Sequence, residues 1–350
     1  MQSRARLCGL AVIVVASLAG NALAHQWTED VFEQKGSVGR PFVAVAGRDA
    51  GRAHTVIGSG RFYQVQTGDT FLDVARYYDL GYNEITEANP GVDPWIPPAG
   101  QIILLPTEWV LPDVEYRGVV VNIPEMRLYA FASGGNGTLV VTTYPVGLGR
   151  DDWQTPSGKF KVVEKTVNPR WVLPESIRAE HRRDGKPAPE FIAGGDPENP
   201  LGKYRIRLSL PLYGIHGTDI PWGVGMQVSH GCIRLYPEDI ERLFPNVPVG
   251  MVGEFVYQPV KVGVRDGHVY VEAHKDIYGM VPGMYREALG LIDKFGWRAR
   301  VDADRLQRAV LEQSGVPIDV TLETQLDEVR EETFTRPTVG SRGEAEPRVP

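Results

Sequence analysis

Apolar and polar residues alternate along the middle of the chain, which predicts β-strands there. In the clearest segment, 204–210, every second residue from Ile206 to Leu210 is apolar and the residues between them are polar. A strand with this period buries one face and exposes the other. Within 117–257, helical patterns are sparse until 237–244, so we expect this region to form a mainly β domain. Three further strands are predicted in it, at 119–123, 127–131 and 139–144.

A helical period stands out in the preceding segment, 63–106. Apolar residues from Phe71 to Tyr78 follow the spacing of one helix face. The Thr-x-x-Asp sequence at 70–73 is a capping signal that marks the start of this helix. A second short helix, capped by Asn83, is predicted to end at an Asn-Pro-Gly turn. With a strand at each end, the segment predicts a small α+β unit of the order strand, helix, helix, strand.

Three stretches of this unit carry a specific resemblance. They are Tyr-Gln-Val-Gln-Thr-Gly-Asp-Thr at 63–70, Glu-Ala-Asn-Pro at 87–90 and Ile-Ile-Leu-Leu-Pro at 102–106. Together they resemble a LysM domain, and the resemblance covers all of 63–106. It implies binding to glycan that contains N-acetylglucosamine, here peptidoglycan. The alternative is a spacer that binds no ligand.

The first 24 residues have the pattern of a secretory signal peptide. Arg4 and Arg6 precede an apolar stretch at 7–19, and Ala-Leu-Ala at 22–24 fits the small-x-small cleavage pattern. The apolar stretch is shorter than the roughly 20 residues that span a bilayer. We therefore expect residues 1–24 to be cleaved, rather than kept as an anchor helix, and the protein to be exported.

The remaining segments are less regular. Residues 25–62 are expected to form an extended lead-in. Residues 258–330 are expected to form a C-terminal extension, in which Asp266-Gly267 between alternating valines predicts a hairpin. Residues 331–350 are polar and are expected to be disordered. Two shorter elements are predicted inside these segments, a strand at 41–46 and a helix at 304–313.

The net charge and the number of cysteines limit the classes of function that the chain can have. The chain has 350 residues and a formal net charge of −7. This charge argues against a nucleic-acid binder with a basic surface, and it gives no electrostatic steering toward acidic peptidoglycan. Of the two cysteines, Cys8 and Cys232, signal cleavage removes the first. A single cysteine in an oxidising compartment is an intermolecular bridge, an inert buried thiol or a nucleophile.

The surroundings of Cys232 favour a reactive thiol. His216 lies 16 residues upstream, after an alternating strand, so a returning loop can bring it to the thiol. In an extended backbone, His230, Cys232 and Arg234 would share one face. Gly231 would let a substrate backbone approach closely. Two alternatives stay open: a structural thiol, and a zinc site in which His216 and His230 join Cys232.

Two motifs in this region carry a second resemblance. His-Gly at 216–217, followed by Ser-His-Gly-Cys-Ile-Arg at 229–234, resembles the signature of the L,D-transpeptidase (YkuD-like) catalytic domain. Thr-Pro-Ser-Gly at 155–158 and Phe160 match the Thr-Pro-x-Gly-x-Phe element of that family, and the resemblance spans 117–257. It implies a mainly β, β-sandwich-like fold. It also implies acyl transfer from a peptidoglycan stem peptide through a cysteine thioester, with no metal or other cofactor.

The same resemblance implies a role for each motif residue. Cys232 is the nucleophile, and His216 is the general base, ranked above His230 although His230 is nearer in sequence. The Gly217 carbonyl orients the imidazole. The remaining roles are shaping of the loop and oxyanion site by Ser229 and Gly231, and substrate binding by Arg234 and His230.

The order of signal peptide, LysM unit, catalytic domain and extension resembles the Gram-negative group that anchors an outer-membrane lipoprotein to peptidoglycan. It implies a periplasmic enzyme that releases D-Ala from a tetrapeptide stem and passes the acyl group to an amine. The acceptor is a lipoprotein lysine or a second diaminopimelate. The alternatives are a hydrolase that uses the same thioester and a wall-binding protein without catalysis. The insert 168–200 is expected to be a lid or flank over the cleft, or an ordinary surface loop.

Overall fold

The computed structural model describes residues 32, 42–44, 54–134 and 138–323. Within them the main sheet has nine strands, in the order β1-β8-β7-β6-β17-β10-β13-β14-β16. The predicted signal peptide and the tail 331–350 lie outside the described residues. Among the described helices, none combines the length and the apolar character that a membrane span requires. The nine strands are β1 (Phe42–Ala44), β6 (Gly118–Asn122), β7 (Arg127–Ser133), β8 (Leu139–Pro145), β10 (Gly158–Val167), β13 (Tyr204–Leu208), β14 (Gly214–His216), β16 (Ile233–Arg234) and β17 (Val252–Val256).

One face of this sheet holds the main hydrophobic core. Alternate residues of the strands point into it, among them Ile206 and Phe255, each at most 1% exposed. Helix α5 (Pro237–Asn246) covers this face, and its Leu243 is part of the same core. The mainly β character predicted for 117–257 is confirmed.

The opposite face of the sheet is only partly covered. Over β6 and β7, outward residues such as Val120 and Tyr129 join Trp109 and the LysM unit in a second core. Over β10 and β13 the outward residues are polar and partly or fully exposed, such as Lys161 and Arg205. Two strands connect the LysM unit to the sheet, β2 (Val56–Gly58) and β5 (Glu108–Val110), which pair antiparallel.

The LysM unit has the predicted order of elements. They are β3 (Arg61–Gln64), α2 (Phe71–Tyr77), α3 (Tyr82–Ala88) and β4 (Ile102–Leu105). Thr70 caps α2 as predicted, because its Oγ1 accepts a hydrogen bond of 3.2 Å from the Asp73 N–H. The predicted capping role of Asn83 is wrong. Helix α3 begins after Gly81, and Asn83 lies inside it, where its Nδ2 donates to the Glu125 carbonyl at 2.9 Å.

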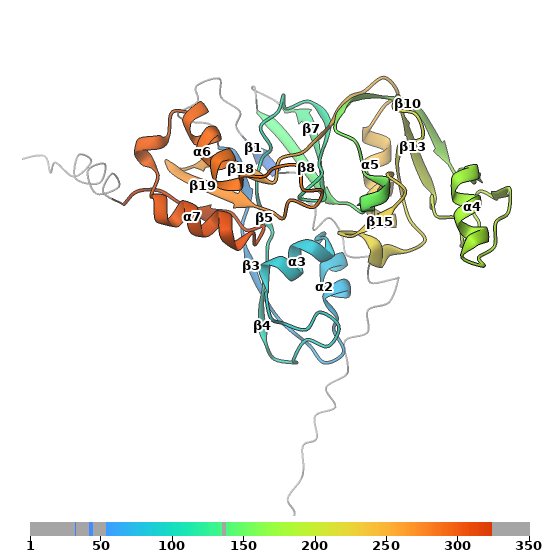
Figure 1. Cartoon of the computed structure of the whole chain (residues 1–350), viewed down its shortest axis with the longest axis horizontal. Helices are drawn as coiled ribbons and strands as arrows, with labels where there is room; N and C mark the ends of the chain where they lie inside the picture. Colours follow the sequence, from blue (N-terminus) through green and yellow to red (C-terminus); the bar gives the residue numbers. More distant parts are fainter. Residues whose placement is uncertain (1–31, 33–41, 45–53, 135–137, 324–350) are drawn as a thin grey trace, which may run out of the picture.

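The C-terminal extension packs beside the sheet (Figure 1). Its hairpin joins β18 (Val260–Arg265) to β19 (His268–Ala273) through Asp266 and Gly267, both with positive φ, which confirms the predicted turn. The predicted helix at 304–313 is α7 (Ala303–Glu312). The helix α6 (Met284–Lys294) and the strand β20 (Ile318–Asp319) of this extension were not predicted.

The insert 168–200 forms a short helix and a two-stranded sheet, and it lies at one edge of the molecule (Figure 1). It consists of β11 (Trp171–Val172), α4 (Glu175–Arg183) and β12 (Phe191–Ile192), with β11 and β12 paired antiparallel. The remaining short elements are β9 (Leu148–Gly149), β15 (Gln227–Ser229) and 3-10 turns at Asp151–Trp153, Pro221–Gly223 and Arg298–Arg300.

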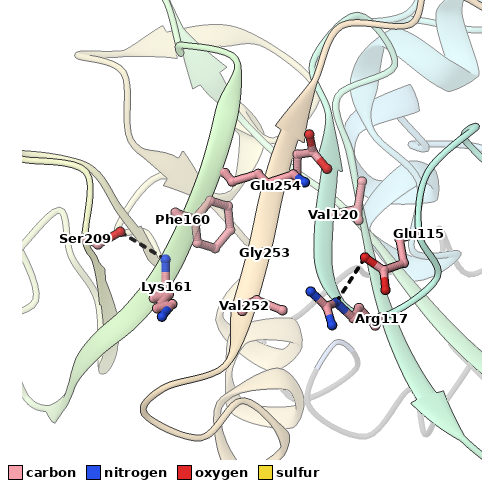
Figure 2. Close-up of a pocket in the computed structure, with 10 residues that line it drawn as sticks. Glu115, Arg117, Val120, Phe160, Lys161, Ser209, Val252, Gly253 and Glu254 are labelled. Atoms are coloured by element: carbon pink, nitrogen blue, oxygen red, sulfur yellow. Dashed lines mark hydrogen bonds and ion pairs between the residues drawn. The ribbon is translucent and has the colours of Figure 1, made fainter.

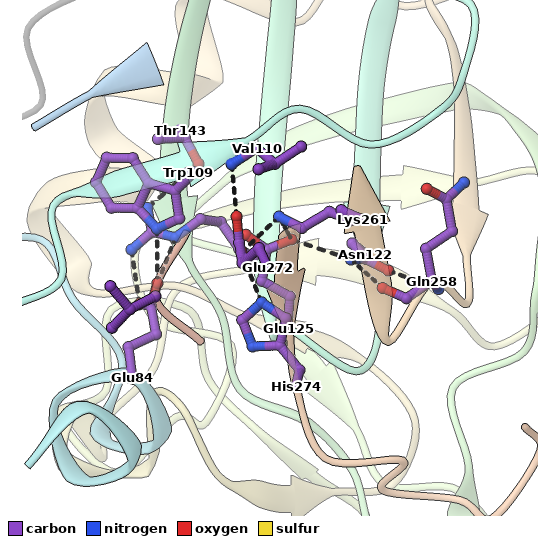
Figure 3. Close-up of polar contacts among 12 residues, drawn as sticks. Glu84, Trp109, Val110, Asn122, Glu125, Thr143, Gln258, Lys261, Glu272 and His274 are labelled. Carbon is purple, nitrogen blue, oxygen red and sulfur yellow. Dashed lines mark hydrogen bonds and ion pairs between the residues drawn. The ribbon is translucent and has the colours of Figure 1, made fainter. Parts of the chain in front are cut away.

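A buried ion pair joins the LysM unit to the main sheet (Figure 3). Arg127 of β7 is fully buried, and its Nη2 lies 2.7 Å from Oε2 of Glu84 in α3. The indole N–H of Trp109 donates to the same carboxylate at 2.9 Å, and the Arg127 guanidinium lies 4.2 Å from the Trp109 ring centroid. Burial is therefore matched by an opposite charge and several hydrogen bonds, as a buried charge requires.

A second buried cluster joins the sheet to the C-terminal extension (Figure 3). The Lys261 ammonium lies 2.8 Å from Glu125 and 2.7 Å from Glu272, and all three side chains are fully buried. Nε2 of His274 lies 2.6 Å from Glu272, which also accepts a hydrogen bond from the Val110 N–H. The three units thus share buried charges as well as apolar cores.

Removing the Arg127 guanidinium is expected to destabilise the whole protein. Arg127→Met leaves the Glu84 carboxylate buried without its cation, which costs about 3–5 kcal/mol. Urea denaturation followed by tryptophan fluorescence measures the change. Arg298→Met is the matched control, because its ion pair with Asp293 is 54% and 53% exposed and such pairs contribute about 0–1 kcal/mol. Equal losses in the two variants would contradict the anchoring role.

Candidate active site

The candidate site is built on the parallel pairing of β14 with β16. Ile215 aligns with Ile233 and His216 with Arg234. Both isoleucines are buried in the main core, at 0% and 1% exposure. Because side chains alternate along a strand, His216 and Arg234 point away from that core, to the same face as Cys232.

His216 is held by the carbonyl of the next residue. Its Nδ1 lies 2.7 Å from the Gly217 oxygen, and because a carbonyl only accepts, Nδ1 carries the proton and Nε2 keeps its lone pair. Burial lowers the pKa of His216 to about 3, and the positive charges of Arg234 and Arg205 act in the same direction. The imidazole is therefore neutral at neutral pH and able to accept a proton.

Cys232 follows a sharp turn at Gly231. Gly231 has φ of +98°, and a Cβ at this position would lie 2.6 Å from a ring carbon of Tyr213, so a glycine is required. Ser229 Oγ donates to the Cys232 carbonyl at 2.7 Å and accepts from the Gly231 N–H at 3.1 Å. Because that N–H is already engaged, this geometry supports loop shaping by Ser229 and Gly231.

The thiol of Cys232 is protonated in the resting site. Burial raises the pKa of Cys232, and the Gly214 N–H and the charges of Arg205 and Arg234 offset part of that rise. Sγ lies 3.5 Å from the Leu212 carbonyl oxygen, to which the thiol donates. A neutral thiol needs a base before it can attack a carbonyl.

The Thr-Pro-Ser-Gly motif braces the cysteine loop. Thr155 Oγ1 donates to the Gly231 carbonyl at 3.0 Å and accepts from the Gly149 N–H at 3.2 Å. Tyr278, from the C-terminal extension, donates to the Gly149 carbonyl at 2.8 Å and accepts from the Thr155 N–H. Tyr278 was missed in the sequence, because it lies about 45 residues from the nearest motif residue and has no motif of its own.

His230 lines a pocket together with Arg234. The positive φ of Gly231 shows that the backbone between His230 and Cys232 is not extended. The Nε2 of His230 donates to Glu180 of α4 at 2.9 Å, and Arg150 binds the same carboxylate at 2.9 Å. The bonds from Arg150 and His230 lower the pKa of Glu180 to about 2. This contact holds the insert against the site. Glu180 and Arg150 belong to no motif, so no pattern in the sequence indicated them.

The insert forms the wall of a pocket beside these residues. The pocket has a volume of about 570 Å³, and most of its lining comes from the insert, including Trp171 and Phe191. His230, Arg234 and Asp219 close it on the catalytic side. The volume is within the range of small-molecule sites. The insert therefore flanks the cleft, which agrees with one of its two predicted forms.

A second hollow, of about 330 Å³, lies farther along the sheet (Figure 2). Lys161, Arg117 and Glu254 line it over β10, β6 and β17. None of the predicted site residues lines this hollow. We therefore assign the chemistry to the pocket walled by the insert and to the residues beside it.

The three groups of the zinc alternative are not brought together. Among the described residues, one cluster has the geometry to hold a metal ion, and it consists of Glu125, Glu272 and His274. The Lys261 ammonium already lies between the two carboxylates of that cluster. His216, His230 and Cys232 form no such group within the described residues, so the zinc alternative has no support in the structure.

Comparison with known proteins gives two domain matches. The L,D-transpeptidase catalytic domain matches residues 116–262, and the LysM domain matches residues 63–106. The probable L,D-transpeptidase YcfS of Escherichia coli is 35% identical over 275 residues, which cover 76% of this chain and 85% of the relative. The chain belongs to the L,D-transpeptidase family. Both resemblances seen in the sequence are confirmed.

Two further relatives of this L,D-transpeptidase have similar coverage. The probable L,D-transpeptidase YbiS of E. coli is 38% identical over 226 residues, covering 63% of this chain and 72% of YbiS. The probable L,D-transpeptidase ErfK/SrfK of Salmonella typhimurium is 35% identical over 255 residues, covering 71% of this chain and 81% of the relative. The protein is thus an L,D-transpeptidase-type enzyme of peptidoglycan metabolism that carries a LysM domain.

Protonation of His216 is expected to link folding to pH. An unfolded histidine binds a proton below about pH 6.5, whereas the folded His216 binds one only near pH 3. The folded state then binds fewer protons between these values, so its stability is complete above pH 6.5 and falls as the pH falls. From pH 7 to 4.5, wild type is expected to lose about 2–3 kcal/mol more than His216→Gln in urea denaturation.

His181→Gln provides the control for this measurement, because His181 is a surface histidine of α4. Its stability should follow the wild-type pH dependence. A His216→Gln curve parallel to wild type would show that the imidazole is not buried in its neutral form.

Proposed function

We propose that this L,D-transpeptidase is cysteine-dependent, with Cys232 as the nucleophile and His216 as the general base. One observation carries the proposal: His216 is fixed by a 2.7 Å hydrogen bond to the Gly217 carbonyl on the face of the sheet that holds Cys232. A carbonyl thus takes the orienting place that a carboxylate has in other triads. The free Nε2 of the neutral imidazole can accept the thiol proton.

The reaction proceeds in two half-reactions. In the first, His216 takes the proton from Cys232, and Sγ bonds to the carbonyl carbon of the L-centre residue before the terminal D-Ala. The C–N bond to D-Ala breaks, and the imidazolium gives its proton to the leaving amine. In the second, an acceptor amine attacks the thioester, the S–C bond breaks, and the acceptor's proton returns to the thiol through His216.

The other motif residues support this chemistry. Ser229 and Gly231 fix the turn that presents Cys232. Arg234, which lines the insert pocket beside the thiol, is proposed to bind the donor peptide. His230 lines the same pocket and holds Glu180, so it shapes substrate binding through the position of the insert.

The acceptor we propose first is a lysine of an outer-membrane lipoprotein, with a second diaminopimelate as the alternative. The order of the LysM and catalytic units supports this choice, because it is similar to that of the lipoprotein-anchoring group. We also propose that residues 1–24 direct the protein to the periplasm. The LysM unit is proposed to bind peptidoglycan glycan, and its buried ion pair with the sheet would hold that glycan in a fixed orientation to the cleft.

Acyl-enzyme formation tests the proposal. The protein without residues 1–24 is incubated with disaccharide-tetrapeptide, and intact mass spectrometry follows the adduct. Wild type should gain the mass of the donor minus D-Ala, and Cys232→Ala should gain none. His216→Gln should acylate about 10²- to 10⁴-fold more slowly, the contribution typical of a positioned base.

Three acceptor conditions separate the alternatives: a peptide ending in lysine, a second tetrapeptide, and water alone. D-Ala release without a new cross-link in any of them would favour a hydrolase. Absence of a wild-type adduct, with glycan binding retained by Cys232→Ala, would favour the wall-binding alternative and refute the enzyme mechanism.

A further inference from the structure

Arg205 is a cation beside the site that neither the motif nor the resemblance assigns. It lies on β13 directly opposite His216 in the antiparallel register. Its neighbour Ile206 is buried in the main core, so Arg205 points to the face that carries His216, Cys232 and Arg234. The guanidinium extends over Gly214, because its Nε would lie 3.8 Å from a Cβ at that position.

The charge of Arg205 reaches both reacting groups. It lowers the pKa of Cys232 and that of His216, in each case as a smaller contribution beside burial. The charges of two arginines therefore act on Cys232: Arg234, which also lines the insert pocket, and Arg205 of β13.

Arg205 differs from the other arginine of its strand in having no hydrogen-bonded partner. Within the described residues it makes no hydrogen bond and no ion pair. Arg207, two residues on and pointing to the same face, donates to Glu164 at 2.8 Å. Arg205 is also half-buried, whereas Arg207 is exposed. The charge of Arg205 acts on the Glu164 carboxylate only through space and as a smaller contribution than that of Arg207. A partly desolvated guanidinium without a hydrogen-bonded counter-ion is suited to bind an anion from solution.

We propose that Arg205 binds the free carboxylate of the residue that leaves when the donor peptide acylates Cys232. This inference rests on the proposed function. In a tetrapeptide donor that carboxylate belongs to the residue directly after the attacked carbonyl, about 3–4 Å from the carbonyl carbon. Such a carboxylate can reach a guanidinium beside the thiol, and the planar fork of arginine can bind both of its oxygens.

The proposal predicts specificity for a donor that ends one residue after the attacked bond. An additional residue moves the carboxylate away from Arg205, and amidation removes its charge. Either change leaves the guanidinium without its partner, which weakens the complex with the donor.

The test compares two donors, the tetrapeptide with a free C-terminus and its C-terminal amide, by the rate of acyl-enzyme formation under kcat/KM conditions. Arg205→Gln should lower the rate with the free acid about 10- to 100-fold, the range for a hydrogen bond to a charged group. It should leave the rate with the amide nearly unchanged. Arg205→Lys should recover part of the loss.

Arg207→Lys is the matched control, since it alters an arginine of the same strand and face but keeps a cation to pair with Glu164, which also interacts with Arg205. It should leave both donors unaffected. A third donor, with lysine in place of diaminopimelate, removes the side-chain carboxylate of that residue, and the loss caused by Arg205→Gln should persist with it.

Equal losses with the acid and the amide would overturn the proposal, because they would indicate a structural effect. A loss that disappears only with the lysine donor would overturn the assignment to the leaving residue. If wild type forms no adduct with any donor, the proposed function fails and this inference fails with it. Failure of the inference alone appears as normal wild-type acylation with no preference for the free acid.

Discussion

The parallel pairing of β14 with β16 is the constraint on which the candidate site depends. Only two residue pairs form it, and its register is fixed because Ile215 and Ile233 must both enter the core. A slip by one residue would expose the isoleucines and bury His216 and Arg234 in apolar surroundings. The hydrophobic effect on one face of the sheet thus positions the polar chemistry on the other.

Buried charges extend this rigidity to the other units. Arg127 and Glu84 bind the LysM unit to β7, and Lys261 binds the C-terminal hairpin to the same sheet. Tyr278 of the C-terminal extension donates a hydrogen bond to Gly149, which Thr155 connects to the loop that carries Cys232. The C-terminal extension is therefore part of the scaffold of the site, although it contains no motif residue.

Local patterns in the sequence predicted most of the helices and strands. The two motifs predicted the central residues of the candidate site, Cys232 and His216. The alternation in 204–210 and the Thr70 cap were sufficient because each depends on neighbours in sequence. The errors arose where tertiary contacts decide. Asn83 bonds to Glu125 instead of capping a helix. The turn at Gly231 also interrupts the extended backbone that a strand pattern would assume between His230 and Cys232. The partners that hold the loop and the insert come from distant segments, so no local pattern could indicate them.

Electrostatics at the site differ from those of the whole chain. The net charge of −7 offers no attraction for an acidic polymer. At the thiol, however, Arg205 and Arg234 supply positive charge, while burial keeps both Cys232 and His216 neutral. A neutral pair requires no permanent thiolate in an oxidising compartment, and the two cations favour the thiolate only once the base has taken its proton. Recognition and activation can then depend on the same few local charges, whatever the sign of the whole surface.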